Sequence, residues 1–210
     1  MKVQQGSSST PARRTQAGRT AATRDALVST ARELFAAHGF AAVSTEQIVR
    51  AAGVTRGALY HQFADKTELF AAVFDAVEAD VTRRIVAAVE ALGPDVDPVE
   101  LMVHGSQEWL AAAADPEVHR IMLVDAPAVL GWVRWREICL RYALGMVEGM
   151  LGFAVDAGRV AAQPLRPLAH VLLGASDEAA LYVALAPDRA AALAEMNAAL
   201  ASVVRALAIR

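Results

Sequence analysis

The most constraining feature of this chain is the stretch STEQIVRAAGVTRGALYHQF at residues 44–63. Ser44, followed three residues later by Gln47, is the pattern of a capping box, which starts a helix. Gly53 allows the positive φ of a sharp turn, and Thr55 can cap a second short helix. Two short helices joined by such a turn form a helix-turn-helix, whose second helix fits the DNA major groove.

Helical periodicity continues on both sides of this motif. Apolar residues at helical spacing predict one helix over residues 23–38 and a longer one over residues 66–92, roughly 40 Å at 1.5 Å per residue. Five further helical segments are bounded by Asp-Pro pairs and glycines: 97–114, 115–126, 132–157, 167–186, and 187 to near the C-terminus. Strand-like alternation is missing, so the sequence predicts an all-α fold.

Residues 20–81 resemble the DNA-binding region of the TetR family of bacterial transcriptional regulators. The resemblance rests on three motifs in order: TRDALVSTARELFAAHGF, AAGVTRGALYHQF and ADKTELFAAVF. It implies an N-terminal three-helix helix-turn-helix domain joined by a long helix to a C-terminal effector and dimerisation domain, residues 82–210. In that second half only the helical layout fits the family.

Seven residues are the candidate DNA contacts. Arg56 can pair with guanine through its guanidinium, or it contacts a phosphate instead. Gly57 lets the recognition helix approach the groove closely, and the resemblance places Tyr60 and His61 at phosphate-contacting positions. The full set is Thr45, Thr55, Arg56, Gly57, Tyr60, His61 and Lys66.

The charge is unevenly distributed along the chain. Residues 1–19 contain Lys2, Arg13, Arg14 and Arg19 and no acidic residue, whereas residues 20–81 hold more acidic than basic side chains. We therefore expect residues 1–19 to be a flexible basic tail that adds phosphate contacts. The alternative is that these residues are an inert leader.

The second half contains a concentration of aromatic and methionine side chains, which suit an apolar ligand site. All three tryptophans lie there, and the DNA-binding half has none. The candidate ligand-binding residues are Trp109, Met122, Trp132, Trp135, Tyr142, Met146 and Phe153. The alternative is that these side chains are ordinary core.

Two apolar stripes near the C-terminus indicate a homodimer; the alternative is that both are buried only against the core of one protomer. They are Leu168, Leu172, Ala175, Ala179, Tyr182 and Ala186, and then Leu193, Met196, Leu200, Val203 and Leu207. A dimer would place two recognition helices one turn of DNA apart. The resulting hypothesis is a homodimeric repressor of double-stranded operator DNA that a small-molecule effector releases. A corepressor response stays open.

Other classes of protein find little support in the sequence. The catalytic and nucleotide-binding patterns GxSxG, HExxH, GxGxxG and the Walker loop are missing, and the histidines have no metal-ligand spacing with Cys139. We therefore expect no enzyme, no metal and no cofactor. The lone cysteine, a start without an apolar signal segment and the lack of a membrane-length apolar run predict a cytoplasmic protein. The competing hypotheses are a helical enzyme and an architectural DNA-binding protein without an effector.

Overall fold

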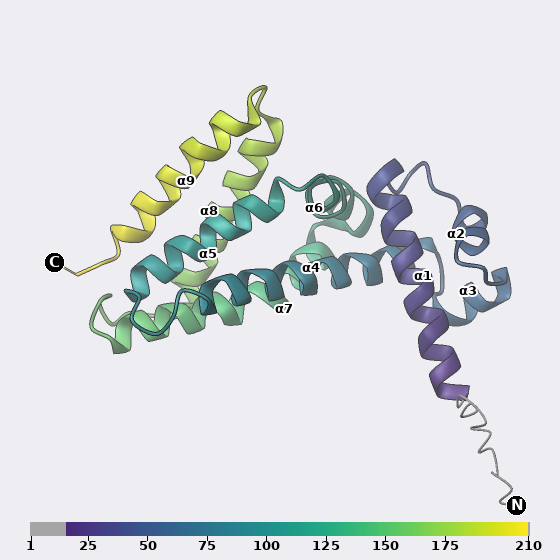
Figure 1. The fold of residues 1–210 in the computed structure, drawn as a ribbon, viewed down its shortest axis with the longest axis horizontal. Coiled ribbons are helices and arrows are strands. Elements are labelled where there is room, and N and C mark those ends of the chain that lie inside the picture. The colour runs from purple at the N-terminus through teal and green to yellow at the C-terminus, as the bar shows by residue number, and fades with distance from the viewer. Residues whose placement is uncertain (1–15, 210) are drawn as a thin grey trace, which may run out of the picture.

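The computed structural model describes residues 16–209, and every regular element within that range is a helix (Figure 1). An isolated antiparallel bridge between Val160 and Ala208 is the one β-type contact there. The predicted all-α class is confirmed.

The first helix, α1 (Gln16–His38), begins earlier than predicted. Residues 16–19 were expected in the flexible tail, but they are helical, since the segment is rich in Ala and Arg, which favour helix. The Thr20 and Thr23 hydroxyls also donate to the carbonyls of Gln16 and Arg19. The rest of the predicted tail, residues 1–15, lies outside the described residues.

The helix-turn-helix forms as the caps predict. In α2 (Thr45–Ala51) the Ser44 hydroxyl accepts from the Gln47 backbone N–H, and the Gln47 side chain accepts from the Ser44 backbone N–H. Gly53 has a φ of 66°, and Thr55 caps α3 (Arg56–Gln62) by accepting from the Ala58 N–H at 3.1 Å. Local sequence therefore determines where both helices of the motif begin.

The long helix α4 (Lys66–Glu90) runs out of this unit and along the second half of the molecule (Figure 1). One continuous hydrophobic cluster runs along it and joins Leu27 and Phe35 in α1 to Trp135 and Ile138 in α7. The two halves are therefore packed on a shared core, and no flexible linker separates them.

The second half is built from five further α-helices and one π-helical turn. Their bounds are α5 (Pro98–Ala113), α6 (Pro116–Val118), π-helix η1 (His119–Asp125), α7 (Ala126–Asp156), α8 (Leu165–Leu185) and α9 (Arg189–Arg205). The predicted break before residue 132 is a kink inside α7, where Gly131 has φ 75° and ψ 158°. The helix begins earlier, at Ala126, because Pro127 lies in its first turn, where its missing N–H is not needed.

The expectation about membrane-length segments was wrong. Residues 116–156 and α8 have the length and mean hydropathy of a membrane span. This is weak evidence for a membrane, because core helices also meet these criteria. Arg134, Arg136 and Arg141 of α7 form ion pairs with Glu68, Asp177 and Asp75, which ties that segment to the rest of the protein.

Candidate nucleic-acid interface and ligand cavity

The recognition helix α3 presents a polar outer face over an apolar inner one. Leu59 and the adjoining Phe63 are buried against the core, which turns Arg56, Tyr60 and His61 toward solvent. The Thr55 cap uses its hydroxyl to bind the start of the helix. A Cβ atom at Gly57 would meet only the Thr55 hydroxyl, at 3.9 Å, so the protein's own packing does not require glycine at this position.

Arg56 is not free on this surface. Its Nη1 lies 3.1 Å from the Glu46 carboxylate of α2, and its guanidinium lies 5.5 Å from the centre of the Tyr60 ring. Both members of the ion pair are well exposed, so the pair is weak and can be exchanged for another partner. Sequence reasoning did not identify Glu46, an acidic residue on the face predicted to contact DNA.

Lys66 has a structural role at the start of α4. Its Nζ donates to the carbonyls of Phe40 and Val43, both at 2.9 Å, and lies 4.0 Å from the centre of the Phe40 ring. An ammonium has three hydrogens, so one donor remains for an outside partner. Thr45, in the first turn of α2, directs its hydroxyl to the Glu46 carboxylate at 3.3 Å.

A cavity lies in the second half, among α4, α5, α7 and α8. Its empty space amounts to about 1030 Å³ when the open mouth is included. Four of the predicted ligand-binding residues, Trp109, Met122, Trp135 and Met146, line it together with further apolar side chains. These include Val81, Ile85, Met102, Met150, Leu172 and Leu173.

Three of the predicted ligand-binding residues lie elsewhere. Trp132, next to the Gly131 kink, is 68% exposed, and its ring lies against Trp135 with centroids 4.9 Å apart and planes tilted by 48°. Tyr142 faces α4, where its hydroxyl bonds Asp75, and burial raises its pKa to about 12. Phe153, in the last turn of α7, is exposed.

Polar groups in the cavity wall were not predicted. Glu78 of α4 is 5% exposed, and this burial raises the pKa of its carboxyl to about 7. The neighbouring carboxylates of Asp177 and Asp75 raise this pKa further, while a hydrogen bond with the Cys139 thiol opposes the rise. One sequence feature could have indicated that Glu78 is buried. It lies four residues after Phe74 and three before Val81, on an apolar face of the helix.

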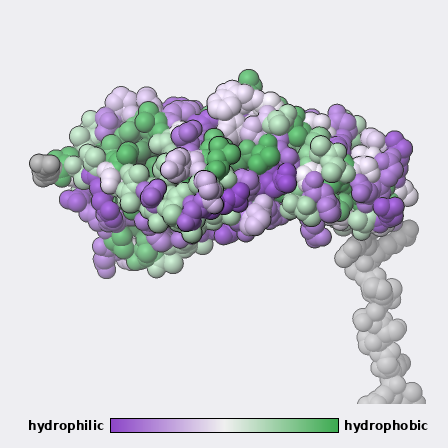
Figure 2. All heavy atoms as spheres, turned by 90° about the horizontal axis from the view of Figure 1, so that it is seen from above, coloured by the Kyte–Doolittle hydropathy of each residue, from purple (hydrophilic) through white to green (hydrophobic). Residues whose placement is uncertain are grey.

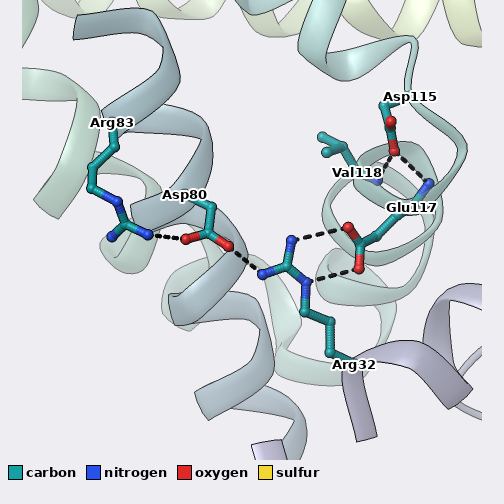
Figure 3. Close-up of polar contacts among 6 residues, drawn as sticks. All are labelled: Arg32, Asp80, Arg83, Asp115, Glu117 and Val118. Carbon is teal, nitrogen blue, oxygen red and sulfur yellow. Dashed lines mark hydrogen bonds and ion pairs between the residues drawn. The ribbon is translucent and has the colours of Figure 1, made fainter. Parts of the chain in front are cut away.

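Ion pairs connect the DNA-binding half to the helices of the second half. Arg32 of α1 binds both oxygens of Glu117 in α6, at 2.7 and 2.9 Å, and also pairs with Asp80 of α4 (Figure 3). Asp80 in turn pairs with Arg83, and Asp115 caps α6 by accepting from the backbone N–H of Glu117 (Figure 3). The Glu117 hydrogen bonds raise the pKa of the Arg32 guanidinium, so it stays charged.

Two further links join the second half to the DNA-binding half. One runs from the end of η1 to the turn after α1, and the other runs from α7 to the first turn of α4. The Asp125 carboxylate accepts from the Phe40 backbone N–H at 2.8 Å, and Arg134 binds both oxygens of Glu68 at 2.6 and 2.9 Å. A displacement of α7 would therefore act directly on the start of α4, next to the recognition helix.

The helices α8 and α9 expose several large apolar side chains, which together are called their apolar face below. They are Val171, Tyr182, Leu185 and Val203. Figure 2 shows hydrophobic surface, in green, over the second half of the molecule. Most of the two predicted stripes instead pack inward: Leu168, Leu172, Ala175, Ala179, Leu193, Met196, Leu200 and Leu207 belong to or pack on core clusters of the protomer. The helical spacing of these residues agrees with packing inside one protomer, because periodicity alone does not distinguish core from interface on helices that are apolar around most of their circumference.

Known proteins match both halves of the chain. The profile described as "Bacterial regulatory proteins, tetR family" matches residues 27–73, and "Tetracyclin repressor-like, C-terminal domain" matches residues 99–207. The regulator CymR of Pseudomonas putida is 34% identical over 99 residues, a match that covers 47% of this chain and 49% of CymR. The Tn10 TetC protein of Escherichia coli is 26% identical over 152 residues, which is 72% of this chain and 75% of TetC.

Solved structures agree over nearly the whole length. A TetR-family regulator from Pectobacterium atrosepticum has a TM-score of 0.81 and 33% identity, with 94% of this chain and 99% of that one covered. RolR in complex with resorcinol has the same fold at 20% identity, with a TM-score of 0.69 and coverage of 91% and 95%. The helix-turn-helix, the helical second half and these matches together identify the chain as a member of the TetR family, a transcriptional regulator and not an enzyme.

Proposed function

We propose that this protein is a homodimeric repressor that leaves its operator when a small molecule occupies the cavity of the second half. The observation that carries the proposal is the position of α4. Its first turn follows the recognition helix directly, and Glu78, Val81 and Ile85 farther along it line the cavity. A ligand that displaces α4 would change the spacing of the two recognition helices in a dimer, which must match one turn of DNA, roughly 34–36 Å.

The proposed DNA contacts are Thr45, Thr55, Arg56, Gly57, Tyr60, His61 and Lys66. The outward position of Arg56, Tyr60 and His61 supports them, and so does the one free ammonium hydrogen of Lys66. The proposed ligand contacts are Trp109, Met122, Trp135 and Met146, which line the cavity. RolR, which shares the fold, binds resorcinol, and this supports a small-molecule role for the second half. The proposal places the protein in the cytoplasm, with its operator.

The test begins with an operator selected from random DNA by the purified full-length protein. A candidate ligand is then titrated with and without this operator, and tryptophan fluorescence is recorded, because every tryptophan lies in the second half. Linkage requires that a ligand which weakens DNA binding is itself bound more weakly in the presence of DNA, by the same factor. Equal ligand affinities in the two titrations would contradict release by the ligand. Tighter ligand binding with DNA would make the ligand a corepressor.

A further inference from the structure

One polar group in the cavity wall is a hydrogen-bond donor without a partner. Trp135 is 7% exposed and lines the cavity, and its indole Nε1 has no hydrogen-bond partner among residues 16–209. By contrast, the Nε1 of Trp109 donates to the Ser176 carbonyl at 3.1 Å. A buried donor without an acceptor costs free energy, so a ligand that supplies an acceptor here gains affinity.

A second polar group nearby is an acceptor with only a weak partner. The carboxyl of Glu78 is buried and bonds the thiol of Cys139, which is a poor donor. The two neighbouring carboxylates already have cations, since Asp177 pairs with Arg136 and Asp75 with Arg141. Glu78 has no such cation among the described residues, so its oxygens can accept a further hydrogen bond.

The packing of α7 against α4 places the Trp135 donor and the Glu78 acceptor in the same wall of the cavity. Trp135 and Cys139 are one turn apart on α7, so their side chains are neighbours, and Cys139 touches Glu78 across the cavity wall. A hydroxyl group has one hydrogen to donate and lone pairs to accept with. Apolar side chains, methionine and leucine among them, line most of the remaining wall and suit a hydrocarbon body.

We propose that the effector is an uncharged, largely apolar molecule with a hydroxyl group that accepts from Trp135 Nε1 and donates to Glu78. This proposal rests on the proposed function, because it names the functional group by which the same cavity would recognise its effector. A cationic ligand would leave the Trp135 donor without an acceptor. An anionic ligand would meet the carboxylates of Glu78 and Asp177.

The experiment uses matched probes and isothermal titration calorimetry on the full-length protein without DNA. The hydroxyl probes are 4-propylphenol and 1-octanol. Their methyl ethers keep an acceptor but lose the donor, and 4-propylbenzylammonium tests a cation. We expect each hydroxyl probe to bind about tenfold more tightly than its ether. Equal binding of hydroxyl and ether, tighter binding of the cation, or no binding of either hydroxyl probe would overturn the proposal.

Two variants test the residues. Trp135→Phe removes the donor that the hydroxyl probe and its ether both use, so it should weaken both probes and leave the preference for hydroxyl over ether in place; unchanged affinity for both would contradict the role of Trp135. Glu78→Met removes the acceptor that only the hydroxyl probe uses, so this preference should largely disappear. The ratio of hydroxyl to ether affinity is taken within each variant, so a change in cavity volume affects both probes alike. Thermal unfolding checks that each variant folds. Glu137→Gln, an exposed carboxyl on the same helix, is the matched control and should keep the full preference. Because no DNA is present, a protein that binds the hydroxyl probes but never releases DNA would refute the proposed function and leave this proposal intact.

Discussion

Glu78 should make the stability of the protein depend on pH. Its pKa is about 7 in the folded protein, against 4.5 as the ordinary value, because burial disfavours the carboxylate. The folded state therefore binds the proton more tightly. The stabilisation is complete below about pH 4.5 and is lost as the pH rises through 7. Glu78→Gln should raise the free energy of unfolding at pH 8 by about 3 kcal/mol and have little effect at pH 4.5. Urea unfolding at the two pH values measures this.

The control for this measurement is Glu137→Gln, on the exposed side of α7. It should leave the difference between the two pH values unchanged. A Glu78→Gln protein that keeps the pH dependence of the original chain would show that other groups cause it.

Arg56 is the residue on which sequence preference should depend most. Arg56→Ala should weaken operator binding by about 1–3 kcal/mol and relax the preference at one position in each half-site. Fluorescence anisotropy with the operator and with single-base variants measures both effects. An equal loss on the operator and on random DNA would instead assign Arg56 to a phosphate.

Glu46 should act against DNA binding, since it holds the Arg56 guanidinium at 3.1 Å and adds a negative charge to the same face. Glu46→Gln should therefore bind the operator several-fold more tightly at low salt, with a smaller gain at high salt, where charges are screened. The anisotropy titration is repeated at two salt concentrations. Weaker binding by the variant would mean that Glu46 holds Arg56 in the orientation that DNA needs.

At the scale of elements, Arg32 should be the main polar link between α1 and α6. Arg32→Ala removes its pairs with Glu117 and Asp80, all of them partly buried, and should cost about 2 kcal/mol of unfolding free energy. Arg83→Ala is the control, because Arg83 pairs with the same Asp80 but is largely exposed, and it should cost about 0.5 kcal/mol or less. Equal losses in urea unfolding would contradict a special role for the α1–α6 link.

Elements with strong local signals could be predicted, and those shaped by packing could not. The caps at Ser44 and Thr55 place the starts of α2 and α3 where the sequence indicated, and α4 begins at Lys66, as its predicted range does. The π-helical turn at His119–Asp125 has no comparable local signal, and Gly131 marks a kink where the sequence indicated a helix start.

The candidate ligand site was predicted in part for the same reason. Aromatic and methionine content indicated the half of the chain in which the cavity lies. Which side of α7 faces the cavity, however, depends on where α4, α5 and α8 pack. Trp135 and Met146 face the cavity, while Trp132 and Phe153 on the same helix do not. Glu78 and Asp177 gain their importance from burial, which a single sequence does not display.

For the whole molecule, the apolar face of α8 and α9 should be the contact between two copies. Val171 is 66% exposed on this face, and Val171→Glu should convert the dimer to a monomer and weaken operator binding. Light scattering after size exclusion measures the mass. Val86→Glu, at an exposed position on α4, should stay dimeric. A Val171→Glu protein of unchanged mass would place the contact elsewhere.

The shared hydrophobic cluster also constrains how such a protein can be recombined. Phe74, Val77 and Val81 follow the recognition helix in the chain, yet they belong to the same cluster as Met122 and Trp135 in the second half. A chimaera that joins these DNA-reading helices to the sensing half of a relative would bring together two surfaces never selected to fit. A chimaera that combines one protein's operator with another's effector would therefore require substitutions on both halves where they meet in this cluster.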